Sequence, residues 1–275
     1  MAREVASEGF TKFFVRLFTA FVYAVVMLGA IVFGRTLGLG IVLAIAALFA
    51  VSELYAFTRR EHRMPNELFG LAATAAMPIA TGLWGYQGLM GTLAALLVAS
   101  MLWHVAFRQV RTSDTAVTVF GAVYVGFLLS HLVLIRALDS GTELALATII
   151  GVWANDVFAY LVGSTMGRHK MAPRISPHKS WEGFAAGTAF TVMVWVAVGY
   201  VADTGLSIPA LTLTGLAVSF AAVLGDLAES RLKREAGVKD SGRLLPGHGG
   251  FLDRFDSMIL VSVVAYYLLI IGGAR

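Results

Sequence analysis

The chain has 275 residues, of which 58% are hydrophobic and only 14% are charged. A soluble domain carries about 25% charged residues. This composition, with a mean hydropathy of +0.78, indicates an integral membrane protein and excludes an ordinary soluble domain. The chain has no cysteine, which excludes disulfides and thiolate metal sites. The formal net charge of +4 is less informative than the distribution of charges along the chain.

Nine apolar segments approach the length of about 20 residues that a transmembrane helix needs. They lie near residues 12–33, 36–57, 67–84, 86–107, 116–136, 143–166, 181–201, 208–229 and 256–272. No long polar linker separates them, so we expect one all-α domain over residues 1–275. This domain would be a polytopic membrane helical bundle of about nine transmembrane helices, with eight or ten as alternatives. The polar N-terminal residues show no cleavable signal peptide.

The basic residues predict the orientation of the bundle. With nine spans, 18 of the 21 Lys and Arg residues fall on the side of the N-terminus. The other side holds only Arg35, Arg136 and Arg275. Because cytoplasmic loops carry the excess of positive charge, we expect the N-terminus and the loops at 167–180 and 230–255 in the cytoplasm. The C-terminus would then lie outside.

A polar segment, residues 230–256, lies between two apolar spans and combines three chemical features. Its cations include Lys233, Arg234, Lys239 and Arg243. Glycines at 247, 249 and 250 surround His248, which would let the backbone approach a ligand closely. Asp253 and Asp256 are three residues apart, on one face of a helix if a helix begins there. Cations and glycines suit phosphates, and paired carboxylates suit Mg²⁺.

The preceding span ends with a polar stripe. On a helix, Asp226, Glu229, Ser230 and Lys233 lie on one face. A purely structural pair of Glu229 with Lys233 would explain Glu229 but would leave Asp226 without a partner. We therefore expect Asp226 and Asp253 as the first pair of metal ligands, followed by Asp256 and Asp156.

Polar groups elsewhere allow two interpretations each. Asp156 lies inside a span beside Asn155 and is a candidate for the site, with a structural hydrogen bond as the alternative. The loop at 167–180 either contacts anionic lipid head groups or binds phosphate through Lys179. Gly163 and Gly167 suit close helix packing. Glu53 is expected to reach the membrane surface or to pair with Arg59.

The 230–256 segment resembles, at every fixed position, the signature of the phosphatidate cytidylyltransferases (CDP-diacylglycerol synthases). The matching residues are Ser230, Lys233, Arg234, Lys239, Asp240, Gly242, Pro246, His248, Gly249, Gly250, Asp253, Arg254 and Asp256. Two further blocks of that family resemble Asn155–Tyr160 and Ser176–Gly183. The resemblance covers residues 150–260, roughly.

This resemblance implies an enzyme that transfers a cytidylyl group from CTP to phosphatidic acid, giving CDP-diacylglycerol and pyrophosphate. It implies Mg²⁺ as the cofactor, and a second, monovalent cation is left open. Residues 1–140 would form N-terminal spans, and residues 141–275 would form the catalytic spans and a cytoplasmic signature loop. The enzyme would lie in a bacterial plasma membrane, bind no nucleic acid, and be able to form a homodimer.

The expected site residues follow from the same reasoning. The catalytic group is Asp226, Asp253, Lys233, Lys239 and Asp256. The substrate-binding group is Asn155, Asp156, Ser176, Lys179, Ser230, Arg234, Asp240, His248, Gly249 and Gly250. The metal ligands are Asp226, Asp253, Asp256 and Asp156.

Two other functions compete with this interpretation. A CTP-dependent polyprenol kinase, or another membrane lipid nucleotidyltransferase, would share the setting and the phosphate chemistry. An ion-coupled transporter would use Asp156, Glu182 and Asp226 as relays, but it predicts repeated halves and acids near the membrane midplane. The Asp-rich pattern of the CDP-alcohol phosphatidyltransferases is missing.

Overall fold

The computed structural model describes residues 2–60, 64–239, 241–242 and 250–275, with side chains from Leu17 onward apart from Arg60. Its elements are α1 (Ala2–Phe33), α2 (Arg35–Arg60), α3 (Glu67–Ala106), α4 (Thr112–Gly121), the π-helix η1 (Ala122–Phe127), α5 (Leu128–Arg136), α6 (Gly141–Met166), β1 (Lys170–Ala172), β2 (Ser176–Ser180), α7 (Trp181–Val201), α8 (Ile208–Glu235) and α9 (Leu252–Gly272). The two short strands form an antiparallel hairpin within the loop expected at 167–180.

Seven helical segments of the described chain are long and apolar enough to cross a membrane. They are α2, α3, the joined α4–η1–α5, and α6 to α9. This confirms the predicted all-α polytopic membrane bundle. The predicted count of nine spans is not confirmed. Within its described side chains, which begin at Leu17, α1 contributes the apolar stretch Leu17–Phe33. The segments expected at 67–84 and 86–107 belong to one helical element, α3, which is interrupted at Gly85.

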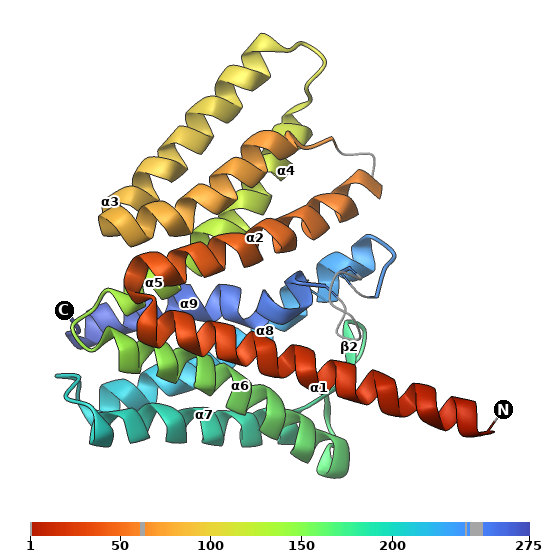
Figure 1. Ribbon diagram of the computed structural model, residues 1–275, viewed down its shortest axis with the longest axis vertical. Coiled ribbons are helices and arrows are strands. Elements are labelled where there is room, and N and C mark those ends of the chain that lie inside the picture. The colour runs from red at the N-terminus through yellow and green to blue at the C-terminus, as the bar shows by residue number, and fades with distance from the viewer. Residues whose placement is uncertain (1, 61–63, 240, 243–249) are drawn as a thin grey trace.

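Gly85 interrupts α3 where the sequence predicts a tight joint. Its φ of 59° and ψ of −142° are not helical, and a positive φ is accessible to glycine because it has no Cβ. The chain reverses direction at this point (Figure 1). A Cβ added at Gly88 would lie only 2.1 Å from the carbonyl oxygen of Ala80. The missing side chain at Gly88 therefore lets the two arms of α3 approach closely beside the reversal.

The α9 helix lies in the middle of the bundle. It packs against α8 and α6 of the C-terminal half and against α2 and α5 of the N-terminal half. Its inward face contributes buried apolar side chains, including Phe255, Met258 and Ile259. The two halves of the sequence therefore share one core, and a residue on α2 can contact the start of α9.

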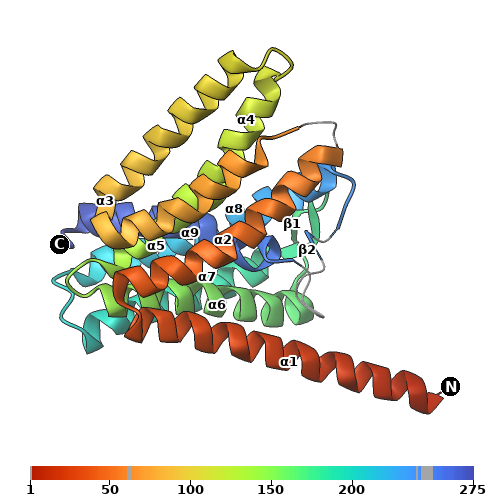
Figure 2. The same cartoon turned by 45° about the horizontal axis from the view of Figure 1, so that its top comes forward.

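The two ends of the bundle differ in the chain segments that they carry. The N-terminus and the β1–β2 hairpin lie towards one end, and the C-terminus lies at the other (Figures 1 and 2). The end of α8 and the beginning of α9 lie at the hairpin end. The polar residues expected in the site are consequently gathered at one end of the bundle.

Candidate active site

The polar stripe at the end of α8 forms as predicted. Ser230 Oγ donates a hydrogen bond to Asp226 Oδ1 at 3.1 Å, and Glu229 Oε2 forms an ion pair with Lys233 Nζ at 2.5 Å. The predicted i,i+4 pair of Glu229 and Lys233 is therefore present. Its environment differs from that of a surface pair, because Glu229 is fully buried and the Lys233 side chain is only 11% exposed.

Close packing of α8 against α9 brings a third carboxylate to this stripe. A Cβ added at Gly225 would lie 2.5 Å from the carbonyl oxygen of Asp256 and 2.9 Å from Cα of Ser257. The backbone of α9 therefore occupies the space that a side chain at position 225 would need. Because Asp226 follows Gly225 directly, this contact places Asp226 and Asp256 at the same level of the helix pair.

Asp226, Glu229 and Asp256 form the one group of described residues with the arrangement of a metal site. Each offers a carboxylate oxygen, and the three oxygens lie within 4.8 Å of one another. Oε1 of Glu229 is buried and has no hydrogen-bond partner. A buried carboxylate oxygen without a donor is costly, and hard oxygen ligands are those that Mg²⁺ prefers. The donor set therefore fits a divalent cation.

Lys179 approaches this carboxylate cluster from the hairpin. It lies in β2, and its Nζ is 2.6 Å from Asp226 Oδ2. Glu182, in the first turn of α7, accepts hydrogen bonds from the backbone N–H groups of Arg168 and His169 and lies 2.6 Å from His169 Nδ1. These contacts tie the start of the hairpin to α7. Glu182 thus orients the loop that carries Lys179.

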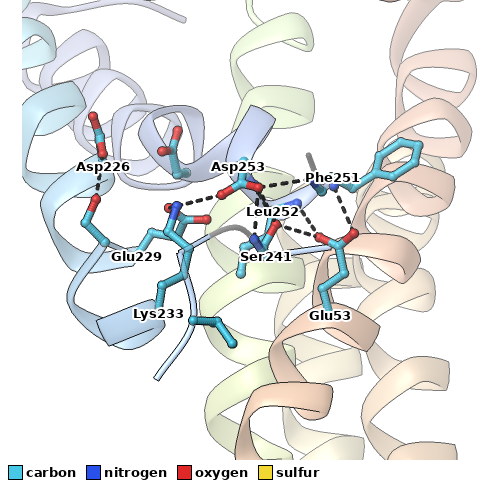
Figure 3. A network of polar contacts seen from close by, with 12 residues as sticks. Glu53, Asp226, Glu229, Lys233, Ser241, Phe251, Leu252 and Asp253 are labelled. Atoms are coloured by element: carbon cyan, nitrogen blue, oxygen red, sulfur yellow. Dashed lines mark hydrogen bonds and ion pairs between the residues drawn. The ribbon is translucent and has the colours of Figure 1, made fainter. Parts of the chain in front are cut away.

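Asp253 has a different environment from the one predicted. Its Oδ1 accepts from Lys233 Nζ at 2.6 Å. Its Oδ2 accepts from the backbone N–H and hydroxyl of Ser241 and from the backbone N–H of Gly250, at 2.8–3.0 Å (Figure 3). Four donors therefore surround this carboxylate. Among the described residues, the group that contains Asp226 also contains Glu229 and Asp256 but not the predicted first partner, Asp253, whose role as a metal ligand stays a prediction.

Lys233 connects these two groups of acids. Its ammonium contacts Glu229 on its own helix and Asp253 on α9. A charge buried this deeply needs partners on both sides, because desolvation is costly. Lys233 consequently fixes the beginning of α9 to the end of α8.

The remaining predicted residues of α6 and the hairpin lie at the edge of the site. Asn155 is 2% exposed, and its Oδ1 accepts a hydrogen bond from Ser219 of α8. The structural hydrogen bond that the sequence left open for Asp156 is thus found at its neighbour, Asn155. Asp156 is exposed and close enough to Asp226 and Lys179 for electrostatic interaction. Ser176 is half-buried at the start of β2, opposite Ala172.

The structure describes only some of the residues in segment 230–256 that are expected to bind phosphate. Arg234 and Lys239 are exposed, and Arg234 Nη1 donates to the carbonyl oxygen of Val238 at 3.2 Å. Gly250 is buried beside Asp253. The predicted residues Asp240, His248 and Gly249 lie outside the described residues.

Glu53 is the residue whose role the sequence did not reveal. The expected pair with Arg59 is wrong, because Arg59 contacts Glu67. The Glu53 carboxylate instead accepts hydrogen bonds from the backbone N–H groups of Phe251 and Leu252, and it shares the hydroxyl proton of Ser241 with Asp253. An acid within a predicted span, near its end, was the only sequence signal, and it did not indicate a partner some 190 residues away.

Comparison with known proteins places the chain among relatives of known name. The model of the family described as "Cytidylyltransferase family" matches residues 14–271. A phosphatidate cytidylyltransferase of Staphylococcus haemolyticus is 34% identical over 259 residues, which cover 93% of this chain and 98% of the relative. One from Mycobacterium bovis is 32% identical over 89% of this chain and 84% of its own length. One from Bacillus subtilis is 42% identical over 149 residues, 54% of this chain and 55% of the relative.

Proposed function

We infer the function from one premise, which is that this chain belongs to the cytidylyltransferase family. Its relatives are phosphatidate cytidylyltransferases. The chain is accordingly a membrane enzyme that transfers the cytidylyl group of CTP to phosphatidic acid, giving CDP-diacylglycerol and pyrophosphate in phospholipid biosynthesis. The rest of this proposal concerns the residues, the cation and the orientation.

We propose that the reaction takes place at the carboxylate cluster of Asp226, Glu229 and Asp256. The observation that carries this assignment is the approach of three acids within 4.8 Å, with Lys179 and Lys233 beside them. Both substrates are anionic, so a site of acids alone would repel them. A divalent cation bound by the three carboxylates would neutralise triphosphate charge and polarise a phosphoryl oxygen. A second, monovalent cation stays a prediction.

The residues of the chain divide the remaining tasks. A phosphate oxygen of phosphatidic acid attacks the α-phosphorus of CTP, and the bond from this phosphorus to the pyrophosphate oxygen breaks. The attacking phosphate is already an anion, so positioning and charge stabilisation contribute more than a general base. Lys179, 23% exposed on the hairpin, is placed to contact the triphosphate. Arg234 and Lys239, which are exposed, would contact phosphate groups that lie farther from the carboxylate cluster.

Asp253 has a positioning role in this proposal. Its hydrogen bond with Lys233 fixes the orientation of that ammonium, and its three contacts with Ser241 and Gly250 hold the first turn of α9. Asp256 lies one turn farther along the same helix and faces the cluster. The two carboxylates that the sequence placed on one helix face therefore serve different tasks, and Asp256 takes the place of Asp253 as the proposed partner of Asp226.

The decisive test compares Asp256→Asn with Asp253→Asn. Both changes keep the shape of the side chain and remove its charge. CDP-diacylglycerol formation from labelled CTP would be measured over a range of Mg²⁺ concentrations. Asp256→Asn should abolish turnover or raise the Mg²⁺ requirement at least about tenfold, as losing a ligand requires. Asp253→Asn should chiefly lower thermal stability in detergent. If Asp253→Asn abolished turnover and Asp256→Asn only lowered thermal stability, the metal ligands would be Asp226 and Asp253.

Orientation and location complete the proposal. The site end of the bundle carries the predicted cytoplasmic loops, and CTP is available in the cytoplasm. The relatives are bacterial, which supports the plasma membrane as the location. A homodimer stays a prediction, and the mass of the detergent-solubilised protein measured by light scattering would test it. A transporter would convert no labelled CTP into a lipid-soluble product.

A further inference from the structure

Glu53 connects the N-terminal helices to the site. It lies on α2 and is only 5% exposed. Its carboxylate accepts from the backbone N–H of Phe251, the N-cap residue of α9, at 3.1 Å and from that of Leu252, the first residue of α9, at 2.9 Å. The first N–H groups of a helix have no partner within the helix. Glu53 supplies these partners from a different part of the chain.

Two glycines make room for this carboxylate. A Cβ at Gly242 would lie 2.2 Å from Glu53 Oε1, and one at Gly250 would lie 2.3 Å from Oε2. Gly242 and Gly250 come from the two sides of residues 243–249. The Glu53 carboxylate therefore lies against the backbone at Gly242 and at Gly250. A side chain at either position would collide with it.

Ser241 links Glu53 to Asp253. Its hydroxyl lies 3.0 Å from Glu53 Oε2 and 2.8 Å from Asp253 Oδ2. Figure 3 shows the two carboxylates facing each other across Ser241, with Lys233 on the far side of Asp253. A continuous set of hydrogen bonds therefore runs from α2, through the start of α9, to α8.

We propose that Glu53 is a positioning residue for the reaction. By holding the first turn of α9, it keeps Asp256 at the distance from Asp226 and Glu229 that a divalent cation needs. This inference rests on the proposed carboxylate cluster. Asp256 lies four residues after Leu252, which is about 6 Å along a helix, so a displaced first turn also displaces its carboxylate. The N-terminal spans thereby contribute to cation binding without touching the cation.

The test uses Glu53→Gln, which keeps the size of the side chain and replaces one accepting oxygen by an amide that cannot accept. Two readouts are measured on the full-length protein in detergent. The first is the rise in Tm as Mg²⁺ is added without substrates, which reports binding alone. The second is the Mg²⁺ concentration for half-maximal CDP-diacylglycerol formation. Each readout gives a midpoint, the Mg²⁺ concentration at which half of the Tm rise or half of the maximal activity is reached. Both midpoints should rise about tenfold, the effect of changing residues that support metal ligands.

The matched control is Glu67→Gln. Glu67 is also an acid of the N-terminal helices, but it contacts Arg59 at the surface and none of the site residues described above. Its substitution should leave both midpoints unchanged. A purely structural role for Glu53 would lower the Tm in the absence of Mg²⁺ without moving either midpoint, and that result would overturn the proposal.

Glu53→Asp covers the case in which Glu53→Gln does not fold. The shorter side chain keeps the charge but withdraws the carboxylate from Phe251 and Leu252, so both midpoints should again rise. Parental midpoints in a folded Glu53→Asp protein would also overturn the proposal. If the parent protein bound Mg²⁺ but formed no CDP-diacylglycerol, the proposed function would fail, while the thermal readout would still decide the role of Glu53.

Discussion

Gly225→Ala tests whether the contact between α8 and α9 sets the geometry of the carboxylate cluster. The added methyl group would lie 2.5 Å from the carbonyl oxygen of Asp256, whereas real Cβ atoms essentially never approach closer than 3.0 Å. Both contacting atoms, this oxygen and Cα of Ser257, belong to the backbone of α9. The helices must therefore separate by about 0.5 Å or more, which costs about 1–3 kcal/mol in a well-packed core.

The same displacement moves Asp256 away from Asp226. A misplacement of about 1 Å in an active site can lower the rate by about a hundredfold. We therefore expect Gly225→Ala to lower CDP-diacylglycerol formation about ten- to a hundredfold and to raise the Mg²⁺ concentration for half-maximal activity. The measurements are initial rates against Mg²⁺ and the Tm of the protein in detergent.

Gly215→Ala is the matched control on the same helix. Its Cβ would lie 2.9 Å from Cα of Val192 on α7, so it imposes a similar backbone clash. Position 215 lies ten residues before Gly225, about 15 Å away along α8. Gly215→Ala should lower the Tm without changing the Mg²⁺ midpoint. Equal midpoints for Gly225→Ala and the parent protein would refute the idea that this helix contact positions the cluster.

Three further predictions concern charge and orientation. Lys233→Ala should destabilise the protein by about 3–5 kcal/mol in thermal unfolding, because it leaves the buried Glu229 without its ion-pair partner. Arg231→Ala, which breaks the exposed pair with Glu235, should change the stability by less than about 1 kcal/mol. Lys239→Ala should keep the Tm and lower kcat/KM for CTP roughly tenfold or more, through loss of one charge-assisted contact; an unchanged kcat/KM would remove Lys239 from the phosphate site. A reporter active only outside the cytoplasm should give signal when fused after Arg275, and signal from a fusion after Arg243 would reverse the orientation.

Much of the local structure follows from the sequence. Long apolar runs must become helices in a membrane, because backbone groups there need internal hydrogen bonds. The reversal at Gly85 follows from a residue that tolerates a positive φ. The 3.6-residue period likewise places Asp226 and Glu229 on one face of α8, beside Lys233. The number of spans was less accessible, because apolar length alone does not show where a membrane-crossing segment begins and ends.

Contacts between distant segments were decided only by the tertiary structure. Asp253 and Asp256 are two acids in the first turns of one helix, and their spacing alone does not show that their environments differ. They separate because Asp253 meets the N–H groups of Ser241 and Gly250, whereas the contact at Gly225 brings Asp256 to Asp226. Glu53 illustrates the same limit. Its partners lie about 190 residues away, and only the packing of α2 against α9 brings a buried acid to the unpaired N–H groups at the start of that helix.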